Sequence, residues 1–91
     1  MLPKRMKAMK QIKIKTYTIK KGGLYRPYQD VRKLYAANWW EACEEFRKWA
    51  LSWLEDSDSE FAEAAKFDIM RCKHPSNLTW DGWNYTIERI K

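Results

Sequence analysis

Hydrophobic and polar positions alternate along the first part of the chain. Residues 10–20, KQIKIKTYTIK, change character at almost every position and are rich in β-branched side chains. This period of two is typical of a β-strand. Gly22 and Gly23 are expected to end the strand, and a second strand is predicted near residues 29–37. The first strand would place Ile12, Ile14, Thr16 and Thr18 on one face and Lys13, Lys15, Tyr17 and Ile19 on the other.

The strongest periodic pattern predicts a helix from about residue 39 to residue 55. Asn38 precedes it as a natural N-cap, and Glu41 follows three positions later, a spacing that resembles a capping box. A helix of this kind must bury its apolar stripe, and the predicted sheet is the obvious surface for it. The stripe comprises Trp39, Ala42, Cys43, Phe46, Trp49, Ala50, Trp53 and Leu54.

The last third of the chain predicts shorter elements. A capping signal at residues 57–60 predicts a short helix over 60–66, and residues 67–72 predict a third strand. Residues 83–90 alternate again and predict a fourth strand. Asp81-Gly82 is a hairpin signal, which either pairs 78–80 with 83–85 or ends the loop between strands three and four.

These elements predict an α+β fold. It would be an antiparallel sheet of about four strands with one long amphipathic helix packed on one face, in the order β-β-α-β-β with room for a short extra helix. We expect residues 1–9 to form a flexible basic arm and residues 10–91 to form a single domain. Six Trp, five Tyr and three Phe supply a core large enough for such a domain.

Apolar runs are too short for a membrane span, which needs about 18 residues. No apolar segment follows the basic N-terminus, so a secretory signal is not predicted. We therefore expect a cytoplasmic protein that does not contact membranes and whose two cysteines, Cys43 and Cys72, are reduced.

Lysine and arginine are concentrated in the first third of the chain. Residues 1–33 contain eleven of them against one acid, Asp30, a local net charge of +10. Residues 34–91 contain seven basic and eleven acidic residues, so the formal net charge of +6 combines a basic end with a mildly acidic body. A concentrated positive field attracts polyanions and acidic protein surfaces.

The basic first strand is the leading candidate for a nucleic-acid interface. If Ile12 and Ile14 face the helix, Lys13, Lys15 and Tyr17 face outward together, and Tyr25 and the loop extend this surface. Lysines neutralise phosphates, and exposed aromatics stack on unpaired bases. Alternatively, the lysines protect an exposed sheet edge from aggregation and the tyrosines belong to the core. The candidate DNA- or RNA-binding residues are Lys4, Arg5, Lys7, Lys10, Lys13, Lys15, Tyr17, Lys20, Lys21, Tyr25, Arg26, Lys33 and Tyr35.

The order strand, Gly22-Gly23, strand, helix over residues 10–54 is similar to the small N-terminal arm-binding domains of phage-type integrases. The likeness covers about half of the chain and rests on element order. Arg26-Pro27 and the lack of a clear third strand before the helix depart from that pattern. The resemblance implies DNA binding.

A protein-binding regulator or inhibitor is the alternative function, of the kind that phages and mobile elements direct against a host protein. Trp40, Arg47 and Leu51 lie beside the apolar stripe of the predicted helix, and Trp and Arg are enriched in interface hot spots. The competing interpretation is that the core extends that far. Residues 41–63 contain eight acids and two bases, which could dock the basic end of a second copy in a homodimer or form a solvated helix face.

Catalytic and metal-binding patterns are weak in this sequence. Cys72 and His74 form one close pair of potential ligands, and Cys43 lies on the apolar stripe, where a core role is favoured. His74 is the single histidine, and no phosphate-binding glycine loop or nucleophile motif accompanies it. We expect a non-catalytic protein without a metal or other cofactor.

Overall fold

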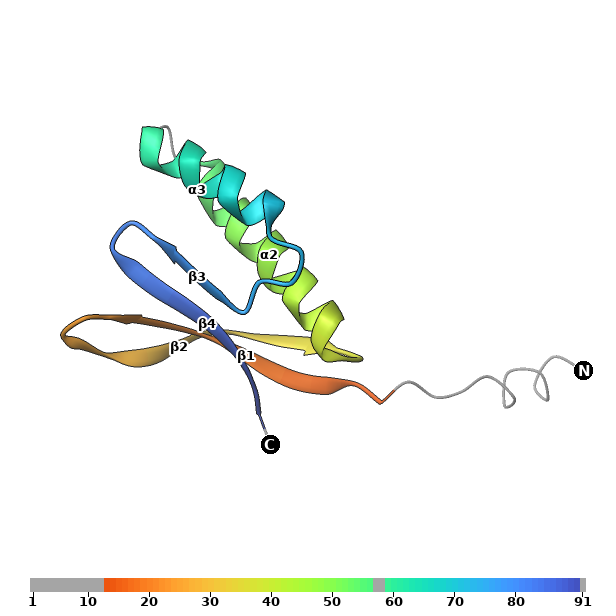
Figure 1. Ribbon diagram of the computed structural model, residues 1–91. Helices are drawn as coiled ribbons and strands as arrows, with labels where there is room; N and C mark the ends of the chain where they lie inside the picture. The colour runs from red at the N-terminus through yellow and green to blue at the C-terminus, as the bar shows by residue number, and fades with distance from the viewer. Residues whose placement is uncertain (1–12, 57–58, 91) are drawn as a thin grey trace, which may run out of the picture.

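Four antiparallel strands and two helices make up the part of the chain that the structure, a computed structural model, describes: residues 13–56 and 59–90. The α+β class is confirmed (Figure 1). In chain order the elements are β1 (Lys15–Gly23), β2 (Arg26–Ala36), α2 (Trp39–Glu55), α3 (Glu60–Arg71), β3 (Asn77–Trp80) and β4 (Trp83–Arg89).

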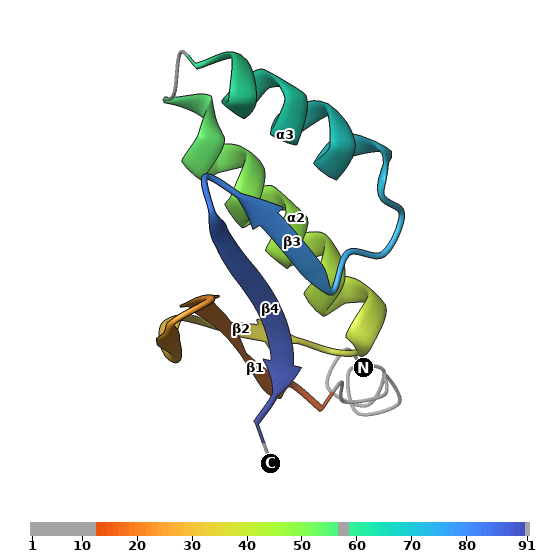
Figure 2. The ribbon, with the colours of Figure 1, turned by 60° about the vertical axis from the view of Figure 1, so that its left-hand side comes forward.

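The four strands form one sheet in the order β2-β1-β4-β3, with every neighbouring pair antiparallel. β1 and β4 are therefore the central strands, although most of the chain lies between them in sequence. Both helices lie on the same side of the sheet and run beside each other (Figure 1, Figure 2). The opposite side, called the open face below, is not covered by any described helix.

Residues 67–72 are not a strand, and the described residues form two helices where the sequence predicted one long helix with a short addition. α3 continues through residues 67–71 and ends at Cys72. Its least exposed positions are Ala62, Ala65, Lys66 and Ile69, a spacing of three and four residues that matches one face of a helix. The short run from 67 to 72 is compatible with a strand or with a helix, and its packing against α2 as part of α3 stabilises the helix.

Local signals correctly placed the ends of α2, and the last hairpin has the first of the two arrangements that the sequence allowed, with 78–80 paired to 83–85. The Asn38 side chain accepts a hydrogen bond from the Glu41 amide at 2.9 Å, as an N-cap does. The Glu41 carboxylate accepts from the Ala37 amide at 3.1 Å, one residue before the position expected for a capping box. Asp81 and Gly82 both have positive φ, 55° and 76°, and join Trp80 to Trp83 in a tight hairpin.

The first strand turns its other face to the core. Tyr17 and Ile19 are almost fully buried, whereas Ile14 precedes β1 and is 61% exposed. The prediction that Tyr17 faces outward is therefore wrong. The sequence offered apolar residues on both faces of this strand, and the large ring of Tyr17 packs near Trp39 at a centroid distance of 5.9 Å.

The glycines do not end β1. Gly22 pairs with Asn84 of β4, and Gly23 pairs with Arg26 of β2, so the strand continues to the turn. Gly22 is buried beneath the ring of Tyr28, where a Cβ would lie 2.7 Å from ring carbons. An aromatic ring laid across a strand glycine restores the packing that the missing side chain would provide.

Aromatic rings dominate the core between the sheet and the helices. The rings of Trp80 and Tyr85 are stacked at a centroid distance of 3.7 Å, and Trp49 of α2 lies 5.9 Å and 5.6 Å from them. Phe46, Ala42 and Ala50 of α2 are completely buried.

The described helices include none that is both long and apolar enough to cross a membrane.

Candidate nucleic-acid interface

The β1–β2 hairpin, here called the basic ribbon and comprising residues 15–36, concentrates positive charge. It carries six cations and one acid, Asp30. The helical layer has the opposite balance, since α2, its C-cap Asp56 and α3 together carry eight acids and four bases. The fold thus converts a charge gradient in sequence into two oppositely charged layers. The six cations are Lys15, Lys20, Lys21, Arg26, Arg32 and Lys33.

The β2 strand of the ribbon is exposed over most of its length, whereas β1 from Thr18 to Gly23 is buried or half-buried and pairs with β4 as far as Gly22. Every residue of β2 from Arg26 to Lys33 is exposed, and burial begins only at Leu34. Figure 1 shows the turn of the ribbon at the end away from the start of α2. β2 is also an edge strand, since it pairs with β1 alone among the described strands. A ribbon with these properties is accessible to a large partner.

The open face of the ribbon carries part of the predicted site. Lys33 lies opposite Thr18, and Tyr35 lies opposite Thr16, so these side chains share the face that points away from the helices. Tyr35 is 64% exposed. Lys15 belongs to the other face, because it alternates with Thr16 and shares its side with the buried Tyr17. The predicted grouping of Lys15 and Tyr17 with Lys33 and Tyr35 is therefore divided between two faces.

Lys20 is already paired. Its Nζ lies 3.0 Å from the Glu88 carboxylate on β4, and this hydrogen bond, reinforced by the charge of Glu88, raises the pKa of Lys20 above its usual value. An ion pair on the surface reduces the charge that a lysine offers to a phosphate. Lys20 is thus a weaker candidate for phosphate contact than Arg26 or Lys33, for which the structure gives no ion pair.

Lys21, Tyr25 and Arg26 meet at the tip of the ribbon, where Trp83 joins them. Lys21 Nζ lies 4.5 Å from the centre of the Trp83 ring, and the Arg26 guanidinium lies 5.7 Å from it. The ring packs on Gly23, whose Cβ position would lie 3.1 Å from it. A hollow of about 200 Å³ is lined here by Gly23, Leu24, Tyr25, Arg26, Gly82 and Trp83.

Leu24 and Tyr25 are 89% and 92% exposed at this tip. Large apolar side chains in solvent beside two cations can contact a planar group, because aromatic faces stack and cations hold an anion nearby. Trp83 and Arg32 were not among the predicted site residues. Trp83 could have been found from the Asp81-Gly82 hairpin, but its contact with Gly23 depends on the pairing of β1 with β4.

The remaining basic candidates lie at the start of the chain. Lys13 is described and exposed, and it precedes β1. Lys4, Arg5, Lys7 and Lys10 lie outside the described residues, as does the predicted arm over 1–9.

Of the predicted protein interface, Trp40 alone is well exposed. Leu51 is partly buried and packs against the core. The Arg47 side chain is 16% exposed, and its Nη1 lies 3.2 Å from Glu44. Trp40 is 58% exposed, with its ring 4.1 Å from that of His74. The three side chains therefore do not form a free patch.

The cysteines and the histidine do not gather into a metal site. Within residues 13–56 and 59–90, no three His, Cys, Asp or Glu side chains are placed to hold a metal ion. Cys43 is fully buried, and this burial, with a smaller contribution from Cys72, raises the pKa of its thiol. Both cysteines are free thiols.

Comparison of the chain with protein-family models, with curated proteins and with solved structures gives no match. The functional argument therefore rests on the geometry above.

Proposed function

We propose that the protein is a small non-catalytic module that binds nucleic acid through the basic ribbon. The observation that carries this proposal is the exposed side of the ribbon, where the turn and β2 from Arg26 to Lys33 present cations and tyrosines around a single acid, Asp30.

Physical chemistry supports this proposal in two ways. Lysine and arginine on the ribbon would neutralise phosphates and release counterions, which is the main source of affinity for nucleic acids. Exposed aromatics also stack on bases in single strands. The acidic helical layer would repel the polyanion, so the ribbon side would face it.

The test is fluorescence anisotropy with labelled duplex DNA, single-stranded DNA and RNA, measured over roughly 50–200 mM salt. We expect Arg26→Ala and Lys33→Ala each to weaken binding several-fold and to lower the salt slope by about 1, as loss of a phosphate contact does. Tyr25→Ala should weaken binding to single strands by about 1–3 kcal/mol if bases stack on this ring.

Lys48→Ala is the matched control, because it removes the same charge from the helical layer. Lys48 is exposed on α2 and lies 3.6 Å from Glu45. Binding of the control should equal that of the unmodified chain. Equal losses for Lys48→Ala and Arg26→Ala would mean that only net charge matters, and the ribbon would then not be an interface.

A second candidate, a protein-binding regulator, is favoured by the free edge of β2. An exposed edge strand can add a strand of a partner to the sheet. This function predicts no binding to any of the three polymers at physiological salt, together with capture of a specific host protein that is lost when Pro replaces residues of β2.

A further inference from the structure

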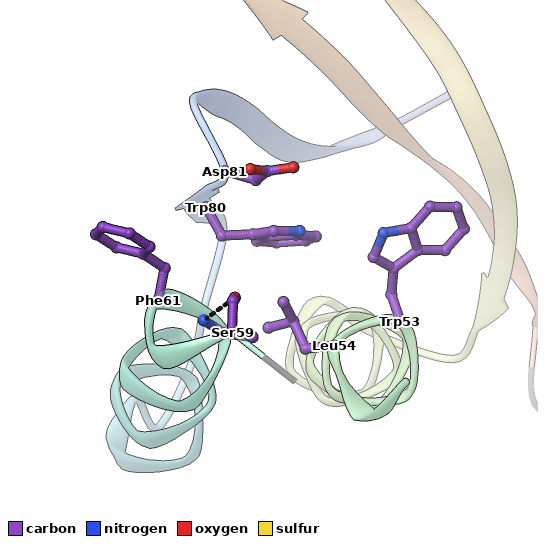
Figure 3. A pocket seen from close by; sticks show the side chains of 7 residues that line it. Trp53, Leu54, Ser59, Phe61, Trp80 and Asp81 are labelled. Carbon is purple, nitrogen blue, oxygen red and sulfur yellow. Dashed lines mark hydrogen bonds between the residues drawn. The ribbon is translucent and has the colours of Figure 1, made fainter. Parts of the chain in front are cut away.

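An aromatic pocket lies away from the basic ribbon, where the end of α2, the start of α3 and the β3–β4 turn meet (Figure 3). Its volume is about 290 Å³. None of its lining residues belongs to the ribbon. They are Trp53, Leu54, Ser59, Phe61, Ala62, Trp80 and Asp81.

Three aromatic rings from three different elements line this pocket. Trp80 is 6% exposed and is held rigidly, because one face of its ring stacks on Tyr85. Trp53 and Phe61 are 60% and 85% exposed. Leu54 and Ala62 are buried and complete an apolar base. Large rings in solvent around a buried ring make a surface that a ligand can cover.

The charge around the pocket is negative. Asp81 lines it, and the described residues 53–56 and 59–63 include four acids and no base. α2 directs its negative end here, and its last turn has no basic residue. The N-terminus of α3 also lies here, but its partial positive charge is reduced in two ways. The Ser59 hydroxyl accepts a hydrogen bond from the Ala62 amide at 3.0 Å, and two glutamates occupy the first turn.

Arg32 of β2 lies near this part of the molecule. It lines a neighbouring cleft with Trp49, Ser52, Trp53 and Asp56, and is not part of the lining of the aromatic pocket. The pocket therefore combines three aromatic rings with the carboxylate of Asp81, and none of its described lining residues is a cation, which favours a cationic ligand over an anionic one.

We propose that this pocket binds an organic cation of the methylated-ammonium class. Aromatic faces attract cations through the ring quadrupole, and this attraction grows as the cation loses water. A methylated ammonium sheds water readily and contacts rings through its methyl groups. A carboxylate such as that of Asp81 adds charge attraction. The pocket is a second site, independent of the basic ribbon and of the function proposed for it.

The experiment is a heteronuclear NMR titration of the isotope-labelled full chain with choline. The probe for comparison is its neutral isostere, in which carbon replaces the quaternary nitrogen. We expect saturable shifts of the indole N–H signals of Trp53 and Trp80, identified with Trp→Phe variants. The isostere should bind about fivefold more weakly, the ratio that about 1 kcal/mol of cation–π attraction gives.

Phe61→Ala should weaken choline binding about fivefold, and Asp81→Asn should weaken it less. Phe61 is exposed, and asparagine tolerates the positive φ of Asp81, so both variants should fold. Phe67→Ala is the control, since Phe67 is an exposed phenylalanine of α3 outside the pocket. Equal binding of choline and its isostere, shifts that do not saturate, or equal losses in the Phe61 and Phe67 variants would overturn the proposal.

Discussion

The contact between Gly22 and Tyr28 links the edge strand β2 to the centre of the sheet, in addition to the pairing of β1 with β4. The ring of Tyr28 lies so close to Gly22 that any Cβ there would meet three ring carbons within 2.8 Å. The Tyr28 hydroxyl accepts a hydrogen bond of 2.7 Å from the side-chain amide of Asn84 on β4. Tyr28 thus spans β1 and ties the exposed edge strand to a central strand.

Gly22→Ala should displace the Tyr28 ring and lower the free energy of unfolding by about 1–3 kcal/mol, as overpacking does. In a Tyr28→Ala background the same change should be neutral or stabilising, because alanine suits a strand better than glycine once the ring is gone. Urea unfolding of the four proteins gives the coupling energy. A loss of the same size in both backgrounds would show that the ring contact is not the cause.

Among the elements, α2 depends most clearly on a local signal. Asn38 supplies the N-cap, and its side chain bonds to the Glu41 amide. Asn38→Ala should lower the free energy of unfolding by about 1 kcal/mol. Ser52→Ala is the control, because Ser52 is exposed within α2, where alanine is the better helix former. Circular dichroism during urea unfolding measures both, and a loss for Asn38→Ala no larger than that of the control contradicts the capping role.

Elements whose local signals agree were predictable from sequence, and those that depend on distant contacts were not. The bounds of α2 follow from the Asn38 cap and a clear apolar stripe, and the last hairpin follows from Asp81-Gly82. The run over 67–72 carried no cap or turn, so contact with α2 decided its structure. The face of β1 was ambiguous for the same reason, since Ile14 and Ile19 lie on opposite faces.

The candidate interface was predicted in part. The sequence placed Lys21, Tyr25 and Arg26 near one another because they are close in the chain, and the structure brings them to one tip. The sequence alone did not indicate that Trp83 lies at this tip, because Trp83 reaches it only through the pairing of β1 with β4. The aromatic pocket was missed for the same reason, because Trp53, Phe61 and Trp80 come from three separate elements.

At the scale of the whole molecule, three groups with raised pKa values make the free energy of unfolding depend on pH in the alkaline range. Burial, with a smaller effect of Cys72, raises the pKa of the Cys43 thiol, and burial followed by the charge of Asp81 raises the pKa of the Tyr85 phenol. The hydrogen bond to Glu88 raises the pKa of Lys20. All three groups therefore hold their protons more tightly in the folded chain than in the unfolded chain.

The sign of the pH dependence follows from this difference. The three contributions are fully present below the unfolded values of 9.0, 10.0 and 10.5. Above them the unfolded chain releases protons that the folded chain retains, so the free energy of unfolding falls as pH rises. We expect stability to decline from about pH 9 upward, and these groups give no pH dependence near neutral pH, where they are protonated in both the folded and the unfolded chain.

Urea unfolding at a series of pH values from neutral to alkaline measures this decline. Cys43→Ala should remove the part of the decline that begins near pH 9. Tyr85→Phe should make the free energy of unfolding fall less steeply with pH above about 10, while leaving the ring stacked on Trp80. Tyr25→Phe is the matched control, since it removes a phenol that is 92% exposed. If Tyr85→Phe and Tyr25→Phe change the slope equally, the decline reflects general charge repulsion at high pH and not the burial of the Tyr85 phenol between the sheet and the helices.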